Sequence, residues 1–346
     1  MANPLGMAVQ LTQSAARIGW YLGVNALAEQ RARRLGHNRT YTPQRPVPTR
    51  AALLRSLGDL LLEDARAVRD GLYPPMEAED GPLPQHIRRV SAMLADLPAA
   101  LARREDGDAD SARAEPSAVG LPDYYTQDFH FQSGGYLSEE SARLYDVQVE
   151  TLFYGSANAM RRAALPFIAR HMAGRDQRRM HLVDVACGTG RLLRQVRLAC
   201  PALQLTGLDL SQSYLDEAAA HMGRLRPARL LAANAEDIPL ENASADIVTT
   251  VFLFHELPPE VRRRVAAEMA RVLKPGGLLV FADSLQMGDR PDWDGLLEAF
   301  PVRFHEPYYR HYAIDDLAAV FEWAGLTPVE TRLAFLAKVM AWRKPG

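Results

Sequence analysis

Short apolar runs alternate with amphipathic segments over the second half of this chain. The apolar runs are predicted strands, at residues 181–186, 203–208, 229–233, 245–251 and 277–282. The amphipathic segments between them are predicted helices, at residues 191–199, 214–223 and 259–273. Strands that are apolar throughout and separated by crossover helices are typical of a parallel sheet covered on both faces.

The pattern changes after the fifth predicted strand. Residues 315–325 form a predicted helix, and residues 327–333 and 337–343 form two predicted strands joined by a tight turn. A tight turn places the last strand antiparallel to its neighbour. The prediction is therefore an α/β fold with seven strands, mostly parallel, with the last strand antiparallel.

The first half of the chain is predicted to be helical and divides in two. Residues 1–115 form an extension whose clearest helix, residues 50–70, has leucines at spacings of three and four. The acidic, small and polar residues 105–116 are interpreted as a mobile linker. Residues 116–180 form a helical cap before a core domain at residues 181–346. A chain beginning near Gly120 is accordingly expected to fold alone.

Composition excludes several classes of function. The net charge of -2 gives no indication of a nucleic-acid partner. Only three of the 40 lysines and arginines are lysines, so arginine clusters are discounted as phosphate sites. No apolar run approaches the ~18 residues that a membrane span needs. Two cysteines and no secretion signal favour a cytoplasmic location.

The strongest chemical signal is a glycine-rich turn directly after the first predicted strand. Gly188 and Gly190 allow close backbone approach to a ligand, and the following helix presents free N–H groups. A dinucleotide site would carry a third glycine where this chain has Leu193. That difference, and the acidic Asp184 inside the strand, argue against NAD or FAD.

This stretch resembles the first motif of class I S-adenosylmethionine-dependent methyltransferases. The resemblance implies a Rossmann-like methyltransferase sheet, with S-adenosylmethionine as the cofactor. Gly188 and Gly190 would wrap the methionine part, and Asp184 would help to hold its ammonium group. Ala186 stands where relatives often have another glycine, a departure that the turn is expected to tolerate.

Four further motifs follow in the family's order. Asp209 ends the second strand and would accept hydrogen bonds from the ribose, with Leu210 beside the adenine. Asn234 and Ala235 stand where relatives often read Asp-Ala, and the Asn234 side-chain oxygen can still accept from the adenine amino group. Phe252 lies at the end of the fourth strand, and the turn at 274–277 matches the family's entry into strand five.

Two aromatic-rich stretches, residues 121–137 and 304–312, flank the motifs, and the segments that contain them, residues 121–145 and 284–312, are expected to form a closing lid over the acceptor. The candidate acceptor residues are Tyr125, Tyr308, Tyr309 and Tyr312. Tyr136 and Tyr145 are candidates for lining the cationic end of the cofactor. Ordinary packing of a cap would explain the same aromatic residues equally well.

Methyl transfer requires a base only if the acceptor must lose a proton. The candidates are His255, His130 and His305, although a packing or solvent-facing role explains each of them as well. No metal site is expected, because the HExxH pattern needs a second histidine where this chain has Pro259.

The leading hypothesis is methyl transfer to a small organic acceptor, nearest to the ubiquinone/menaquinone-biosynthesis type of methyltransferase. The alternatives are a protein or peptide methyltransferase and a regulatory protein that binds the cofactor without catalysis. Residues 18–28 are apolar within an arginine-rich N-terminus, so peripheral membrane contact is considered beside a plain helical cap. The oligomeric state and the methylated atom are not determined by these patterns.

Overall fold

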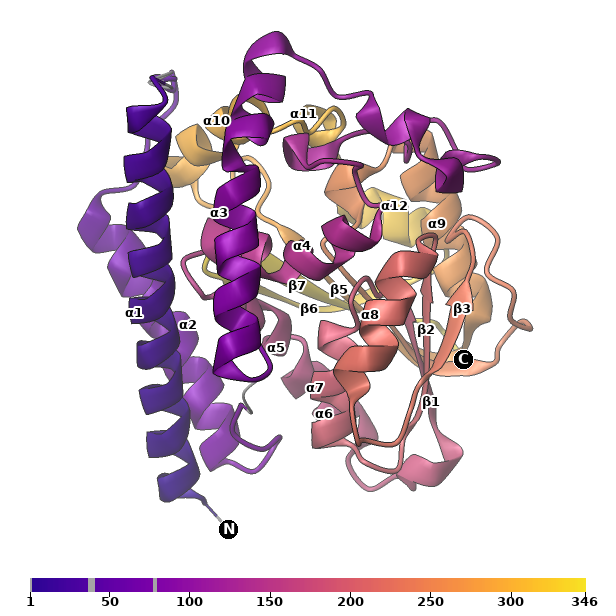
Figure 1. Ribbon diagram of the computed structural model, residues 1–346. Coiled ribbons are helices and arrows are strands. Elements are labelled where there is room, and N and C mark those ends of the chain that lie inside the picture. Colours follow the sequence, from indigo (N-terminus) through magenta and orange to yellow (C-terminus); the bar gives the residue numbers. More distant parts are fainter. Residues whose placement is uncertain (1, 37–40, 77–79) are drawn as a thin grey trace.

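A mixed sheet forms the centre of the molecule in the computed structural model, which describes residues 2–36, 41–76 and 80–346 (Figure 1). The strand order is β3-β2-β1-β4-β5-β7-β6, and β7 alone runs antiparallel to its neighbours. The strands are β1 (His181–Val185), β2 (Gln204–Asp209), β3 (Arg229–Ala232), β4 (Ala245–Val251), β5 (Leu273–Ser284), β6 (Thr327–Ala334) and β7 (Ala337–Arg343). This confirms the predicted seven-stranded, Rossmann-like fold.

Helices cover both faces of this sheet, as the continuous burial of its central strands requires. Leu182, Val183 and Val185 of β1 have no exposed surface, and the inner residues of β4 and β5 are equally buried. The helices after β1 are α7 (Arg191–Ala199), α8 (Gln212–Met222), α9 (Pro259–Val272), α10 (Asp294–Arg303), α11 (Tyr309–Tyr312) and α12 (Leu317–Trp323). Strands buried on both faces explain why the sequence shows apolar runs instead of alternation.

The helices before the sheet are α1 (Pro4–Arg34), α2 (Arg50–Arg69), α3 (Leu83–Asp106), α4 (Glu139–Leu152), α5 (Ala157–Arg162) and α6 (Leu165–Met172). Within the predicted helical cap at residues 116–180, α5 and α6 are two separate helices. Pro166 lies in the first turn of α6, where its missing N–H is tolerated and favours a helix start.

Buried polar contacts tie the N-terminal helices to the rest of the molecule. Asp64 of α2 accepts hydrogen bonds from Gln10 of α1 at 2.5 Å, from Tyr73 at 2.9 Å and from Arg162 of α5 at 2.8 Å. Arg17 of α1 pairs with Asp80, whose carboxylate lies 3.6 Å from Arg191 of α7. The extension therefore packs against the core, and it does not extend away from it.

The segment predicted to be a mobile linker is anchored at its centre. The carboxylate of Asp128 accepts hydrogen bonds from the backbone N–H groups of Ser111 and Ala112, each at 2.9 Å. Ala112 is fully buried. The sequence could not indicate this contact, because the partner lies 16 residues further along in an irregular segment.

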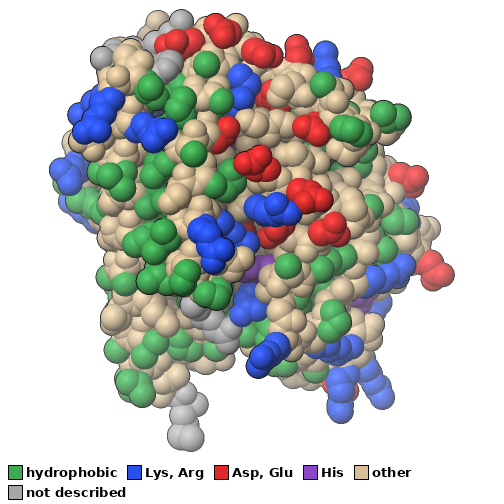
Figure 2. Space-filling view, in the orientation of Figure 1, with side chains coloured by type: hydrophobic (Ala, Val, Ile, Leu, Met, Phe, Trp, Pro, Cys, Tyr) green, Lys and Arg blue, Asp and Glu red, His purple; other side chains and the backbone are tan. Residues whose placement is uncertain are grey.

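The outer surface of α1 retains apolar side chains. Leu5, Leu22 and Leu27 are about half exposed or more, and Figure 2 shows hydrophobic side chains along the edge of the molecule where α1 lies. Among the described residues, no helix is long and apolar enough to cross a membrane. Peripheral contact of α1 with a membrane surface stays a prediction.

Candidate functional site

The glycine-rich turn connects β1 to α7 through three left-handed residues. Ala186, Gly188 and Gly190 have φ angles of 56°, 53° and 74°. The N–H of Gly188 donates to the carboxylate of Asp209 at 2.9 Å, and the N–H of Ser211 donates to its other oxygen at the same distance. Asp209 thus joins the turn after β1 to the end of β2. Left-handed geometry is unfavourable for a residue with a Cβ, so Ala186 is strained where glycine would not be.

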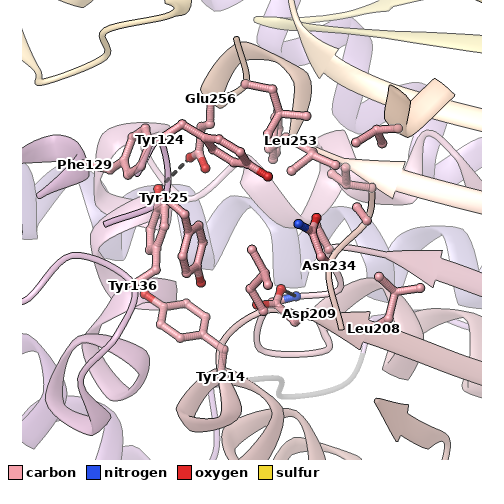
Figure 3. Close-up of a pocket in the computed structure, with 18 of the residues that line it drawn as sticks. Tyr124, Tyr125, Phe129, Tyr136, Leu208, Asp209, Tyr214, Asn234, Leu253 and Glu256 are labelled. Carbon is pink, nitrogen blue, oxygen red and sulfur yellow. Dashed lines mark hydrogen bonds between the residues drawn. The ribbon is translucent and has the colours of Figure 1, made fainter. Parts of the chain in front are cut away.

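A pocket lies beyond the carboxyl ends of β1, β2, β3 and β4 (Figure 3). Such positions bind ligands in open α/β sheets. Nine of the predicted cofactor residues line it: Ala186, Gly188, Asp209, Leu210, Asn234, Ala235, Phe252, Tyr136 and Tyr145. Because no side chain crowds the open face of Gly188, a ligand can approach the backbone there.

Two predicted cofactor residues do not line this pocket. Asp184 accepts a hydrogen bond from the hydroxyl of Thr249 at 2.6 Å, and burial raises its pKa to about 7. Gly190 faces α8, where an added Cβ would lie 2.9 Å from the Cβ of Ala218. The structure therefore places Gly190 in helix packing and Asp184 behind the turn.

Aromatic rings form one wall of the pocket. Tyr136 stacks on Phe129 with ring centres 5.3 Å apart, and it meets Tyr145 and Tyr214 edge-on at 5.8 and 5.6 Å. Its hydroxyl donates to Glu256 at 2.6 Å. Aromatic faces beside a carboxylate create a site that favours a cation. Sequence reasoning had singled out Tyr136 and Tyr145 for this role.

Other residues of this wall were missed or assigned elsewhere. Tyr125, predicted to contact the acceptor, lies in this pocket. Tyr124 also lines it and donates to Glu236 at 2.6 Å. Tyr124 and Phe129 belong to a segment whose aromatic content was visible in the sequence. Tyr214 lies in a helix that gave no such signal.

A second, larger cavity adjoins this pocket. This chamber has a volume of about 790 Å³ and is lined mainly by apolar side chains from α1, α2, α3, α4 and α10. Tyr145, Phe252 and Glu256 line both the pocket and the chamber. The extension at residues 1–115 therefore forms much of the chamber wall, a role that its sequence did not indicate.

Polar groups gather at the end of the chamber nearest the pocket. His255 and Asp283 form a buried pair, with Nδ1 and Oδ1 2.6 Å apart. Burial alone would lower the pKa of His255, but Asp283, Glu306 and Glu256 together raise it to about 10. Burial raises the pKa of Glu256 to about 7. This end of the chamber is thus equipped to hold and transfer a proton.

The three candidate histidines differ in their surroundings. His255 and His130 both line the chamber. His305 is not among the lining residues, and its Nε2 lies 3.0 Å from the side-chain oxygen of Gln127. Burial lowers the pKa of His130 to about 3, so this imidazole is neutral. The structure thus favours His255 and His130 over His305 as site residues.

The predicted acceptor tyrosines also differ in their surroundings. Tyr309 lines the chamber and hydrogen-bonds Ser284 at 2.7 Å. Tyr312 has no exposed surface and donates to the backbone oxygen of Ser284, so it is a core residue. Tyr308 accepts a hydrogen bond from Gln127 at 3.2 Å. This bond joins the two predicted lid segments to each other.

Comparison with known proteins agrees with this geometry. A family model described as a methyltransferase domain matches residues 182–277. An O-methyltransferase of Penicillium expansum is 32% identical over 154 residues, covering 43% of this chain and 53% of that protein. A demethylmenaquinone methyltransferase of Thermotoga maritima is 30% identical over 149 residues, covering 43% of this chain and 60% of that protein.

A ubiquinone/menaquinone biosynthesis C-methyltransferase of Syntrophotalea carbinolica is 32% identical over 155 residues, with the same shares of 43% and 60%. The chain thus spans about half to three fifths of the length of these curated relatives. The matched region contains the glycine-rich turn, Asp209 and Asn234, and the sheet around it has seven strands, mostly parallel with the last one antiparallel, as the sequence predicted. Residues 182–277 thus carry a methyltransferase domain, which agrees with the predicted resemblance to class I S-adenosylmethionine-dependent methyltransferases.

Proposed function

We propose that this protein transfers a methyl group from S-adenosylmethionine to a largely apolar small molecule held in the chamber. The observation that carries the proposal is that the two cavities adjoin, sharing Tyr145, Phe252 and Glu256 in their linings. A ligand in the pocket and a ligand in the chamber would meet at these side chains. Orientation of two reactants in this way can contribute about 7–11 kcal/mol to catalysis.

The pocket residues suit S-adenosylmethionine. When bound, this cofactor supplies an electrophilic methyl carbon on a cationic sulfur. The open backbone at Gly188 would contact its methionine part, Asp209 its ribose and Asn234 its adenine. Tyr136, Tyr145 and Glu256 would face the cation, because ring faces and a carboxylate both attract positive charge. Phe252 lines both this end of the pocket and the chamber.

The chamber favours a small-molecule acceptor over a peptide. Its lining is mainly apolar and its volume, about 790 Å³, falls within the range of small-molecule sites. A peptide substrate would need an open groove with polar groups for its backbone. The O- and C-methyltransferases among the relatives are consistent with a hydroxyl or an activated carbon as the methylated group.

His255 is the residue best placed to exchange a proton with such an acceptor. Its pKa is raised to about 10 by Asp283, Glu306 and Glu256, so it is protonated near neutral pH and takes a proton only in its neutral form, at alkaline pH. Asp283 binds Nδ1, and Nε2 lies 3.8 Å from Oε1 of Glu256 at the edge of the chamber. A carboxylate behind an imidazole fixes its orientation and stabilises the imidazolium that forms.

The chamber can be blocked without touching the pocket. Leu97 of α3 lines the chamber, whereas Ile87 of the same helix is 45% exposed and does not. We expect Leu97→Trp to abolish formation of S-adenosylhomocysteine from S-adenosylmethionine and a series of 4-alkylphenols. Ile87→Trp should retain it. Calorimetry should show unchanged S-adenosylhomocysteine affinity in both variants.

Two outcomes would contradict the proposal. Equal turnover in the two tryptophan variants would remove the chamber from the acceptor site. Tight cofactor binding with no product formed on any apolar hydroxyl or activated-carbon compound would instead favour the regulatory alternative. Turnover on a peptide that is unaffected by Leu97→Trp would favour a protein methyltransferase.

A further inference from the structure

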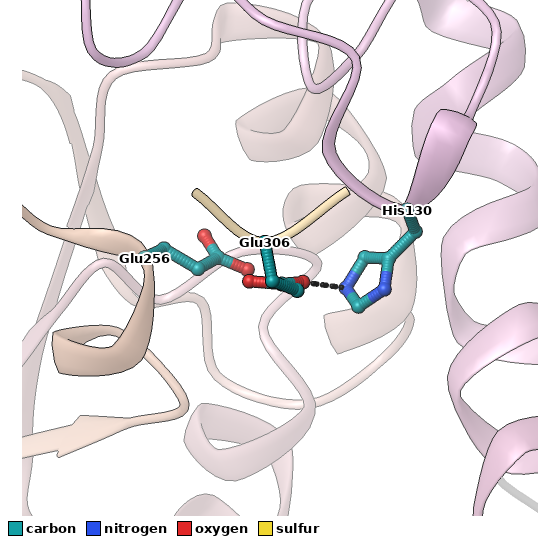
Figure 4. Close-up of side chains that lie close together, drawn as sticks. All are labelled: His130, Glu256 and Glu306. Atoms are coloured by element: carbon teal, nitrogen blue, oxygen red, sulfur yellow. Dashed lines mark ion pairs between the residues drawn. The ribbon is translucent and has the colours of Figure 1, made fainter. Parts of the chain in front are cut away.

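Three side chains from distant parts of the chain meet at the polar end of the chamber (Figure 4). His130 follows α3 in the aromatic segment, Glu256 follows β4, and Glu306 follows α10. One nitrogen or oxygen atom from each of them lies within 4.8 Å of the other two. Nε2 of His130 is 3.1 Å from Oε1 of Glu306. We call these three residues the HEE cluster.

Glu306 lacks the partners that a buried carboxylate normally has. Its side chain is fully buried, yet among the described residues neither of its oxygens has a hydrogen-bond donor in good geometry. Burying an unsatisfied polar group costs about 1–3 kcal/mol, and more when the group is charged. Figure 4 shows its carboxylate between that of Glu256 and the imidazole of His130. A partner bound at this point could interact with all three groups.

The carboxyl groups at this point are unevenly partnered. Asp283 is bound to Nδ1 of His255 at 2.6 Å, and Nε2 of His255 lies 3.8 Å from Oε1 of Glu256. Glu306 has no hydrogen-bonded partner of this kind among the described residues. Buried charges are normally paired or bound to a metal.

The backbone holds His130 in an unfavourable conformation. His130 and the following Phe131 have φ angles of 57° and 56°. Left-handed residues with a Cβ cost on the order of 1–3 kcal/mol and concentrate at functional sites. The carbonyl oxygen of Phe131 accepts two hydrogen bonds from Arg103, at 2.7 and 3.0 Å, which helps to fix this bend. The strain directs the His130 imidazole toward Glu306.

We propose that the HEE cluster binds a divalent first-row transition-metal ion. One imidazole and two carboxylates suit Mn²⁺, Fe²⁺, Co²⁺ or Zn²⁺ better than Mg²⁺ or Ca²⁺, which prefer oxygen ligands alone. Three protein ligands leave further coordination positions open. His130 and Glu256 line the chamber, so an acceptor oxygen could take one of these positions, a role that rests on the proposed function. The sequence search for HExxH could not detect ligands from three separate segments.

Binding of Mn²⁺ to the full-length protein tests this proposal without methyl transfer. After treatment with a chelator, the wild type should bind one Mn²⁺ per chain, measured by calorimetry and by the electron paramagnetic resonance of free Mn²⁺. Glu306→Gln and His130→Gln should each weaken binding by more than about tenfold, since even changes to groups behind metal ligands cost 10–100-fold. His305→Gln is the matched control and should bind as the wild type does.

The competing explanation is a proton shared between Glu256 and Glu306. In that case the wild type would bind no stoichiometric Mn²⁺ or Zn²⁺, and the proposal would be overturned. Equal Mn²⁺ affinity in the wild type and in folded Glu306→Gln and Glu256→Gln would place the ion elsewhere and overturn it as well. Circular dichroism establishes that the isosteric variants are folded. Neither result would affect the test of methyl transfer with Leu97→Trp.

Discussion

At the scale of single residues, the role of a residue could be predicted from the sequence when the residues that define that role lie close together in the chain. Gly188 and Asp209 could be recognised because a turn, a helix start and a strand end have local signatures. The histidines could not be distinguished in this way, because their partners are distant. Asp283 lies 28 residues from His255, and Gln127 lies 178 residues from His305. Whether a histidine belongs to the site or only packs in the protein depends on its burial and its partners, and these are known only from the fold.

His255→Gln tests the role of the buried pair at this scale. The change removes the titratable imidazole but keeps a polar side chain of similar size, and general acid–base groups typically contribute 10²–10⁴-fold. We expect kcat for a hydroxyl acceptor to fall by about that factor, with the affinity for S-adenosylhomocysteine unchanged. His305→Gln, whose imidazole contacts Gln127 and does not line the chamber, should leave kcat within about twofold. A fall in cofactor affinity that matched the fall in kcat would mean a structural role for His255.

At the scale of elements, the sheet and its crossover helices followed from the hydrophobic pattern, whereas the packing of the N-terminal helices did not. An amphipathic helix shows that one face is buried but does not show what buries it. For α1, the partners are α2, α3 and also α4, which lies more than a hundred residues away. The side-chain amide of Asn25 donates to the carbonyl of Thr151, and Gly155 lies against the backbone of Arg17.

Gly155→Ala, compared with Gly174→Ala, tests how much the packing of α1 against the end of α4 contributes to stability beyond backbone strain. Gly155 has φ of 82°, and an added Cβ would lie 2.9 Å from the ring of Tyr21 and 3.0 Å from the carbonyl oxygen of Arg17. Gly174 has φ of 75° with no atom within 4 Å of such a Cβ, so Gly174→Ala reports the strain alone. Left-handed alanine costs about 1–2 kcal/mol, and overpacking adds typically 1–3 kcal/mol.

We therefore expect urea unfolding to show a larger loss of stability for Gly155→Ala than for Gly174→Ala. Because α1 lines the chamber, Gly155→Ala should also raise KM for the acceptor, and Gly174→Ala should not. If the two variants lost the same stability, the contact between α1 and the end of α4 would contribute nothing measurable.

At the scale of the whole molecule, the expectation that a chain beginning near Gly120 folds alone conflicts with the contacts. Removing residues 1–115 would take Asp64 away from Arg162 and Asp80 away from Arg191. It would also remove much of the chamber wall. The sequence suggested independence because residues 105–116 are polar and small. Composition describes how a segment interacts with water, and it does not show whether a distant carboxylate anchors the segment.

Asp64→Ala tests whether the extension is energetically part of the core. The side chains of Asp64 and Arg162 are only 3% and 4% exposed, and Asp64 also binds Gln10 and Tyr73, so one carboxylate connects α1, α2 and α5. Removing one partner of a buried ion pair typically costs 3–5 kcal/mol, because the other charge stays buried. We expect a loss of that size in chemical unfolding, observed as one transition by both tryptophan fluorescence and circular dichroism. Asp59→Ala, on the exposed side of the same helix, should change stability by less than about 0.5 kcal/mol. Two separate transitions, with only the first shifted by Asp64→Ala, would instead show that the extension unfolds independently of the methyltransferase core.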